Sequence, residues 1–143
     1  MLKKISPVLS PELLKAIAEM GHGDELTLAD AHYPQSGSAD VVIRADGVGI
    51  PELLAGILEL IPLDQYNDWQ YGLMATVGDD PEPDIWETYA DIVRREESEA
   101  TPKFFERFEF YEVARRSHVT VLTGETSQYG NIILKKGVVL PQK

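Results

Sequence analysis

The chain has 143 residues, no cysteine and a formal net charge of −11, from 24 acidic and 13 basic residues. This length is enough for one domain with its own core, and the lack of cysteine excludes disulfides and thiolate metal sites. The acidic balance argues against a nucleic-acid partner, since phosphate binding needs clustered Lys and Arg, and against an anionic membrane surface. We find no apolar run typical of a secretory signal or a membrane span, and we expect a cytoplasmic protein.

The first part of the chain predicts one helix and two strands. Ser10-Pro11-Glu12 combines a capping hydroxyl, a proline that fits a first turn and a carboxylate that complements the helix dipole. This helix is expected to end at Gly21. Two short apolar segments follow, at 26–29 and 41–43, and each is typical of a buried strand. The first of them ends at Asp30.

Helix and strand patterns alternate along the remainder of the chain. A second helix pattern lies between Pro51 and Pro62, and a third begins at Ile85, after the acidic turn Gly78-Asp79-Asp80-Pro81. A fourth helix pattern covers 104–116. Strands are expected at 71–77, 119–122 and 131–134.

Alternating helices and strands predict an α/β fold. We expect a single domain over residues 1–143, with a central sheet, mostly parallel or mixed, covered by helices in a three-layer α/β/α arrangement. The loop-rich stretches at 34–40 and 63–70 do not divide the chain.

A histidine stands between two glycines where the first helix pattern ends, in Gly21-His22-Gly23. Imidazole is the side chain whose unperturbed pKa lies nearest neutrality, and neighbouring glycines permit close approach of a ligand. His22 is therefore a candidate general acid or base. The alternative is that His22 is only stabilised by the dipole at a helix C-terminus, and the residues alone do not decide.

Asp30, at the end of a predicted strand, has a natural place for a polar ligand contact in an α/β fold, although it could instead turn the chain. His32 is expected to pack beside Tyr33 and Pro34. With Asp24 and Glu25, these histidines and Asp30 could supply ligands for iron or zinc. Their spacing matches no motif with a known mechanism, so we do not expect a metal site.

The segment Tyr129-Gly130-Asn131 follows a turn and opens a predicted strand. A hydroxyl, an apolar ring and an amide suit a sugar, while the alternative is a simple turn with Gly130 at positive φ. Arg107 could be a fork donor to ligand oxygens or a surface residue. The chain has neither a phosphate-binding glycine loop nor a Gly-x-Ser-x-Gly nucleophile motif, which argues against covalent hydrolysis.

A series of longer segments carries a resemblance to a known family. They are Glu19-Met20-Gly21-His22-Gly23-Asp24-Glu25, Asp30-Ala31-His32, Ile43-Arg44-Ala45-Asp46-Gly47, Phe108-Glu109-Phe110-Tyr111-Glu112, Thr123-Gly124-Glu125 and Tyr129-Gly130-Asn131-Ile132-Ile133-Leu134-Lys135-Lys136-Gly137-Val138. With these segments in this order, the chain resembles the fucose mutarotase and ribose pyranase family over nearly its full length, and most of all its bacterial L-fucose branch. The chain departs from the family pattern between about residues 62 and 103.

The resemblance implies an isomerase of carbohydrate metabolism that interconverts the α and β anomers of L-fucose. It implies no metal and no organic cofactor. It also implies a homodecamer of two stacked pentameric rings, with sites near the subunit boundaries. Carried over by position, His22 is the expected proton donor, and the expected sugar-binding residues are Asp30, Arg107, Tyr129, Gly130 and Asn131. Arg107 favours fucose, because the ribose branch tends to have histidine there.

Anomer exchange needs proton transfers alone, because the ring opens when one proton leaves the anomeric hydroxyl and another reaches the ring oxygen. His22 would donate to the ring oxygen, and Tyr129 or Asp30 could act as the base. Two alternatives remain open. One is a sugar-binding module without catalytic activity, and the other is a ribose pyranase.

Overall fold

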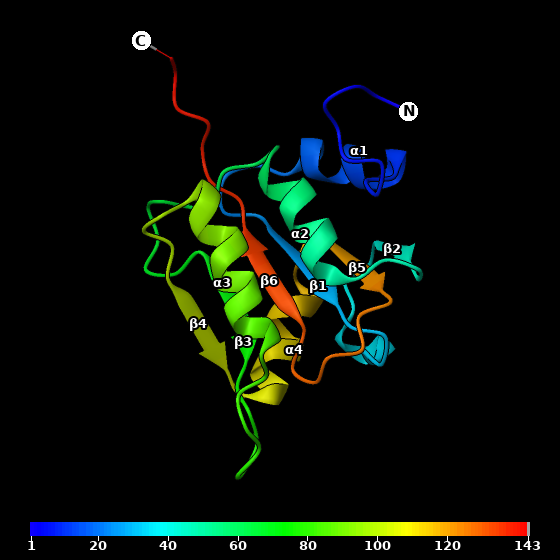
Figure 1. Ribbon diagram of the computed structural model, residues 1–143, viewed down its shortest axis with the longest axis vertical. Coiled ribbons are helices and arrows are strands. Elements are labelled where there is room, and N and C mark those ends of the chain that lie inside the picture. The colour runs from blue at the N-terminus through cyan, green and yellow to red at the C-terminus, as the bar shows by residue number, and fades with distance from the viewer. Residues whose placement is uncertain (143) are drawn as a thin grey trace.

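All six strands of the computed structural model, which describes residues 1–142, join in one sheet of order β2-β5-β1-β6-β3-β4 (Figure 1). The strands are β1 (Glu25–Ala29), β2 (Val42–Ala45), β3 (Tyr71–Met74), β4 (Pro102–Phe105), β5 (Val119–Thr123) and β6 (Ile132–Lys135). The helices are α1 (Pro11–Glu19), α2 (Ile50–Leu58), α3 (Ile85–Glu96) and α4 (Arg107–Arg115), with a short 3₁₀ turn, η1 (Gln35–Gly37).

The sheet is mixed because β6 runs antiparallel to both of its neighbours, β1 and β3. The other pairs, β1 with β5, β2 with β5 and β3 with β4, are parallel. The carboxyl ends of β1, β3 and β4 therefore lie at the same edge of the sheet as the amino end of β6. We call this edge the carboxyl edge.

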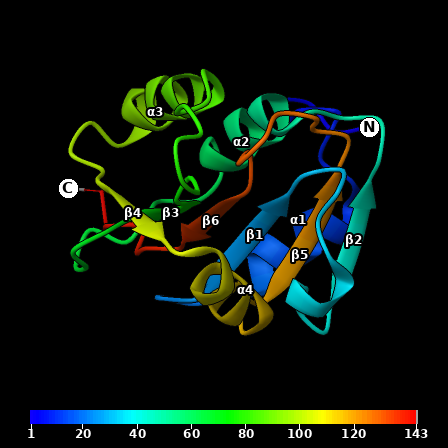
Figure 2. The same ribbon diagram turned by 90° about the horizontal axis from the view of Figure 1, so that it is seen from below.

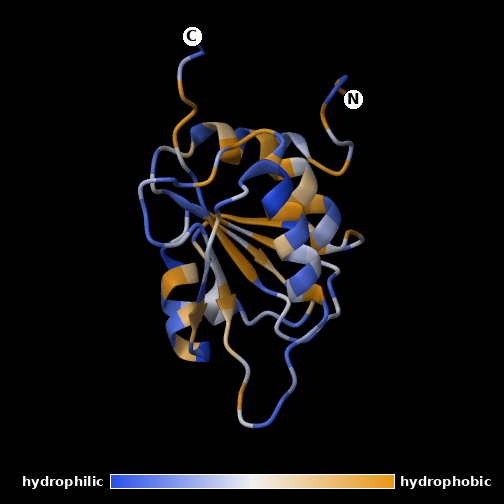
Figure 3. Ribbon diagram, turned by 60° about the vertical axis from the view of Figure 1, so that its left-hand side comes forward, coloured by the Kyte–Doolittle hydropathy of each residue, from blue (hydrophilic) through white to orange (hydrophobic). Residues whose placement is uncertain are grey.

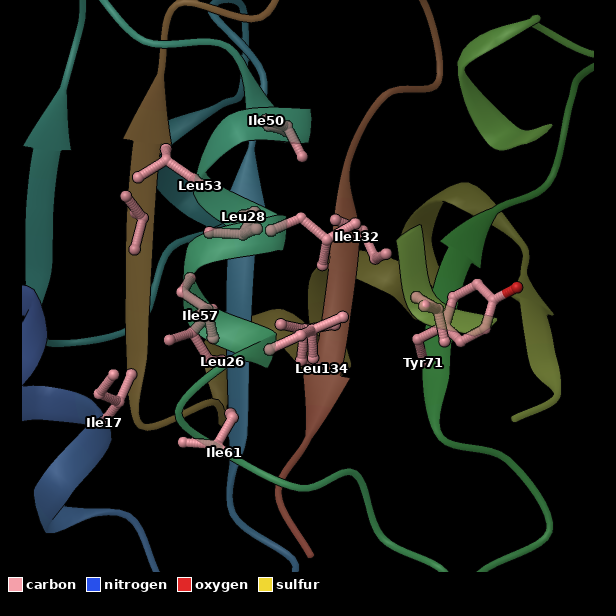
Figure 4. Close-up of a cluster of buried hydrophobic side chains, with 14 of the residues drawn as sticks. Ile17, Leu26, Leu28, Ile50, Leu53, Ile57, Ile61, Tyr71, Ile132 and Leu134 are labelled. Carbon is pink, nitrogen blue, oxygen red and sulfur yellow. The ribbon is translucent and has the colours of Figure 1, made fainter. Parts of the chain in front are cut away.

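Helices cover both faces of the sheet, with α2 and α3 on one face and α4 on the other (Figure 2). Strands β1 and β6 supply the centre of the larger core: Leu26 and Leu28 pack with Leu134 and Ile132 beneath the apolar side of α2 (Figure 4). Ile133 points to the opposite face and packs with Phe110 of α4. Period-two alternation along buried strands thus builds two cores and confirms the three-layer α/β/α arrangement.

Hydropathy follows this layering, since the apolar strands lie inside and polar segments outside (Figure 3). The loop between β3 and α3 extends beyond the carboxyl edge of the sheet and forms the lowest point of Figure 1. Within residues 1–142, none of the helices combines the length and the apolar character that crossing a bilayer would require.

Most predicted boundaries agree with the structure to within a few residues. Ser10 caps α1, accepting a hydrogen bond from the Leu13 amide at 3.2 Å. The fourth helix prediction was wrong at its start, because Phe104 and Phe105 belong to β4, where aromatic residues fit a pleated surface. Helix α4 begins only after Glu106, whose carboxylate accepts hydrogen bonds from the next helical amides.

Gly137, just after β6, is expected to tolerate no side chain. A Cβ there would lie 2.3 Å from the Leu63 carbonyl oxygen, which is backbone and cannot rotate away. Gly137→Ala should lower the free energy of unfolding by about 1–3 kcal/mol, as measured by urea unfolding at fixed protein concentration. The control is Gly47→Ala, since a Cβ at Gly47 meets nothing within 4 Å. Equal stability of the two variants would contradict this packing argument.

Candidate functional site

A cavity of about 310 Å³ opens at the carboxyl edge of the sheet. It is formed by the end of β1, by β3 and the loop that follows it, by α4 and by the segment that leads into β6. Ligands of α/β proteins are commonly bound at such an edge, because the loops that leave the strands converge there. Four of the predicted site residues line the cavity: Asp30, Arg107, Tyr129 and Asn131.

Asp30, directly after β1, and Asn131, directly before the adjacent strand β6, both line the cavity. Oδ1 of the Asn131 side chain accepts a hydrogen bond from the Asp30 backbone amide at 2.7 Å, and Asn131 is buried. This bond fixes the orientation of the Asn131 side-chain amide, whose amino group is its donor toward Asp30 and the cavity. One carboxylate oxygen of Asp30 accepts from the His32 amide at 3.0 Å. The pair offers a ligand both an acceptor and a donor.

The carboxyl group of Asp30 is held in an unfavourable environment. Burial raises its pKa above the usual value, and hydrogen bonds from His32 and Asn131 offset this only in part. Because the folded state then binds a proton more tightly than the unfolded chain, ionised Asp30 reduces stability at neutral pH. The contribution is favourable only at low pH and is lost as the pH rises through the folded-state pKa.

Asp30→Asn is therefore expected to stabilise the folded protein at pH 7 while it weakens ligand binding. The asparagine keeps the acceptor for the His32 amide and removes the buried charge. Thermal unfolding at pH 7 and in acid checks the sign, because the advantage of the variant should shrink as wild-type Asp30 becomes protonated. Asp79→Asn, on the exposed β3–α3 loop, is the control for a general change in net charge. A destabilised Asp30→Asn protein at pH 7 would contradict this account.

Arg107 is the first residue of α4 and lies exposed at the mouth of the cavity. Its Nε donates to the Tyr111 hydroxyl at 3.3 Å, and its guanidinium lies 5.6 Å from the centre of the Phe108 ring. These contacts orient a planar fork donor of permanent positive charge, the type of group that pairs with ligand oxygens.

Tyr129 has an unusual backbone conformation, with φ at +54°, and the predicted alternative of a positive φ at Gly130 was wrong. Helix α3 holds this backbone in place. The Trp86 indole donates to the Tyr129 carbonyl at 2.9 Å, and the Tyr89 hydroxyl donates to the Gly130 carbonyl at 2.6 Å. Gly130 does not line the cavity, but a Cβ there would lie 2.9 Å from the Ser127 carbonyl oxygen. It therefore permits the bend that presents Tyr129.

The sequence reasoning missed other residues that line the cavity. Asp80 and Val77 reach it from the β3–α3 loop, and Tyr111 reaches it from α4. His32, expected to pack beside Tyr33 and Pro34, also lines it and is exposed. The acidic turn at 78–81 was the one sequence feature that drew attention to Asp80. It predicts a loop, but it does not predict that the loop lies against the cavity.

His22 lies at the opposite edge of the sheet, before the first residue of β1. Its Nε2 lies 2.8 Å from Oδ1 of Asp64; the Asp64 side chain is 5% exposed, whereas that of His22 is 47% exposed. The Tyr66 ring lies beside the imidazole, with 5.6 Å between ring centres. Although burial alone would raise the pKa of Asp64, hydrogen bonds from His22 and from the Tyr66 amide lower it below its usual value. Asp64 is thus a buried carboxylate that orients an accessible imidazole.

The two groups of residues are too far apart to act together within one chain. Strand β1 separates His22 from Asp30, and five strand residues span about 17 Å. The structure therefore does not bring His22 into the cavity of its own chain. The same separation parts His22 from His32, and among residues 1–142 no group of three or more His, Cys, Asp or Glu side chains is placed to hold a metal ion.

Residues 3–139 match the model of the RbsD / FucU transport protein family. The chain is 49% identical to the L-fucose mutarotase of Actinobacillus pleuropneumoniae serotype 5b (strain L20), over 96% of this chain and 97% of that protein. It is 46% identical to the fucose mutarotase of Homo sapiens, over 96% of this chain and 94% of that protein.

Solved structures agree with these relatives. The crystal structure of the fucose mutarotase from Streptococcus pneumoniae in complex with L-fucose superposes with a TM-score of 0.93, at 49% identity, over 97% of this chain and all of that chain. Bacillus subtilis RbsD complexed with D-ribose shares the fold, with a TM-score of 0.72 at 22% identity. A family match over nearly the whole chain and full-length relatives near 49% identity lead to one conclusion: the chain belongs to the RbsD / FucU family.

Proposed function

We propose that this protein is a mutarotase that interconverts the α and β anomers of L-fucose. The observation that carries the proposal is the near-complete likeness to a fucose mutarotase crystallised with L-fucose, combined with a polar cavity at the carboxyl edge of the sheet. The relatives named L-fucose mutarotase support the same activity at 49% identity.

The lining of the cavity suits a monosaccharide. Asp30, Asn131 and Arg107 offer an acceptor, an amide donor and a cationic fork donor for sugar hydroxyls. Met74 and the ring of Tyr111 offer apolar contacts for the carbon face of the sugar. A ring held between such groups loses the freedom to tumble, and this positioning favours proton transfer at defined oxygens.

In the proposed reaction, His22 delivers a proton to the ring oxygen while a base removes the proton of the anomeric hydroxyl. The C1–O5 bond then breaks, C1 rotates relative to C2, and the ring closes on its other face. Because Nε2 of His22 is bound to Asp64, Nδ1 is the nitrogen left to face the sugar. The buried Asp64 carboxylate would orient the ring and stabilise the imidazolium, as the aspartate of a catalytic triad does. Tyr129 and Asp30 are the candidates for the base.

The position of His22 requires a second copy of the chain. We propose that His22 of one copy enters the cavity of the next copy, so that the contact joins two different surfaces of the same chain. Such a head-to-tail contact generates a ring when its rotation closes, and the resemblance to the family favours a homodecamer of two stacked rings. Exposed apolar side chains support this contact at both surfaces. Tyr66, beside His22, is 69% exposed, while Phe108, beside Arg107, is 66% exposed.

Saturation-transfer NMR on free L-fucose tests the activity, with other free sugars such as D-ribose for comparison. We expect exchange between the anomer signals to quicken when the protein is added. Binding of L-fucose without faster exchange would instead favour a sugar-binding module. The proposal includes a cytoplasmic location, with which the cysteine-free sequence is compatible.

A further inference from the structure

Two residues of the loop between β3 and α3 form hydrogen bonds with the same hydroxyl in the cavity, that of Tyr129. The Val77 amide donates to the Tyr129 hydroxyl oxygen at 3.1 Å, and this hydroxyl lies 2.5 Å from Oδ2 of Asp80. Both Val77 and Asp80 line the cavity, although the loop extends beyond the edge of the sheet (Figure 1). The loop is therefore joined to the centre of the proposed sugar site.

These two contacts determine what the Tyr129 hydroxyl can offer a ligand. A phenol has one proton to donate and lone pairs with which to accept. The proton is directed to the Asp80 carboxylate, which can only accept, and one lone pair is used by the Val77 amide. What remains toward the cavity is acceptor capacity. A sugar hydroxyl that reaches this oxygen must therefore donate its own proton to it.

We propose that Asp80 is a positioning residue that makes Tyr129 the hydrogen-bond acceptor for the anomeric hydroxyl and receives the phenolic proton during ring opening. This inference rests on the mutarotase function proposed above and assigns the base side of that reaction. It places a residue from the β3–α3 loop at the site of chemistry.

The proton transfers balance in a single step. The anomeric hydroxyl passes its proton to the Tyr129 oxygen as the phenolic proton moves to Asp80. The electron pair released from the O1–H bond forms the C1=O1 double bond, and the pair of the C1–O5 bond goes to O5. O5 takes a proton from the imidazolium of His22 of a second copy. Tyr129 is a phenol before and after this step. Ring closure on the other face reverses each transfer and restores the Asp80 carboxylate and the His22 imidazolium.

The charges around Tyr129 favour a relay over a free phenolate. The hydrogen bond to Asp80 and its negative charge raise the pKa of Tyr129, an effect that Arg107 opposes. The other titratable side chains that line the cavity are Asp30, His32, Tyr33 and Tyr111. Tyr129 is thus protonated near neutral pH, and it can accept a proton only if it passes its own to Asp80 at the same time.

Asp80→Asn tests the inference, with Asp79→Asn as the matched control. Both changes remove one negative charge from the same exposed loop, but Asp79 does not line the cavity. We expect Asp80→Asn to lower kcat for L-fucose exchange by about 10- to 100-fold, with KM changed less than about twofold, because the amide cannot receive the proton. Asp79→Asn should match the wild type, and Asp80→Glu should recover part of kcat.

A second readout separates this role from a merely structural one. In protein labelled with ¹³C at the tyrosine ring, the Tyr129 signal is assigned by its loss in Tyr129→Phe. The phenol should titrate at lower pH in Asp80→Asn than in the wild type or in Asp79→Asn, since the contact that raises its pKa is gone.

The outcomes distinguish the inference from the function on which it rests. If Asp80→Asn has the kcat and the Tyr129 titration of Asp79→Asn while the wild type accelerates exchange, the role of Asp80 is overturned and the mutarotase function stands. If the wild-type protein accelerates exchange of no sugar, the proposed function fails, and the role of Asp80 fails with it.

Discussion

His22→Ala should reduce accelerated anomer exchange by about 10²- to 10⁴-fold, the usual contribution of a positioned general acid. The imidazole is exposed and oriented by Asp64 at 2.8 Å, so its loss removes a proton donor without opening a core cavity. Saturation-transfer NMR measures the rate, and size-exclusion chromatography checks that the assembly is unchanged.

The matched control is His118→Ala. His118 lies at the start of β5, at the same edge of the sheet as His22, and its backbone amide donates to Glu25 of β1. We expect this variant to retain wild-type exchange. A His22→Ala protein that still exchanges the anomers of L-fucose at the wild-type rate would refute the assignment of His22 as proton donor.

Two variants that are impaired in different halves of the site should restore activity when their chains are mixed within one assembly. His22→Ala retains an intact cavity, and Asp30→Asn retains an intact imidazole at the opposite edge of the sheet. If each site combines the cavity of one copy with His22 of the next, about one quarter of the sites in a random equal mixture are intact in both halves. The expected result is about one quarter of the wild-type rate, measured by NMR after co-refolding or co-expression.

The mixing experiment has its own control. Chains of His22→Ala mixed with a double variant that carries both changes should remain inactive, because no copy then supplies an imidazole. Mass spectrometry of intact assemblies establishes that the two chain types share a particle. Mixed particles without restored exchange would mean that His22 and Asp30 do not serve a common site.

The layers of the fold could be predicted from the sequence, because helix caps and apolar runs are signals that lie within a few neighbouring residues. Ser10 and Pro11 mark the start of α1, and the short apolar run Leu26-Thr27-Leu28-Ala29 predicts the buried strand β1. The sequence prediction failed at β4, because the residues Pro102–Phe105 show no strict apolar alternation and run directly into the helical pattern of α4. Phe104 and Phe105 fit a helix face or a pleated edge equally well until β3 pairs with them.

The sequence predicted most residues of the candidate site, but it did not predict which of them lie together, and the physical reason is a different one. Asp30 and Asn131 lie far apart along the chain, and β6 becomes a neighbour of β1 only through antiparallel pairing. Their shared place in the cavity therefore depends on topology, which residue types alone do not specify. The hydrogen bonds of His22 with Asp64 and of Tyr129 with Asp80 depend in the same way on the positions of long loops relative to the sheet.

Because β6 runs antiparallel to its neighbours, its first residue lies next to the cavity and its last residue lies near His22. Asn131 precedes β6 at the cavity. At the other end, the carbonyl of Lys135, its last residue, accepts a hydrogen bond from the Asp64 amide, and the carbonyl of Lys136 accepts one from the Gly23 amide. Inserting one residue would turn Ile132 and Leu134 toward the α4 face and shift one end by about 3.3 Å against the other. The length of β6 is therefore constrained both by the cavity and by the His22–Asp64 pair. In a closed ring, this length would contribute to the distance between successive sugar sites.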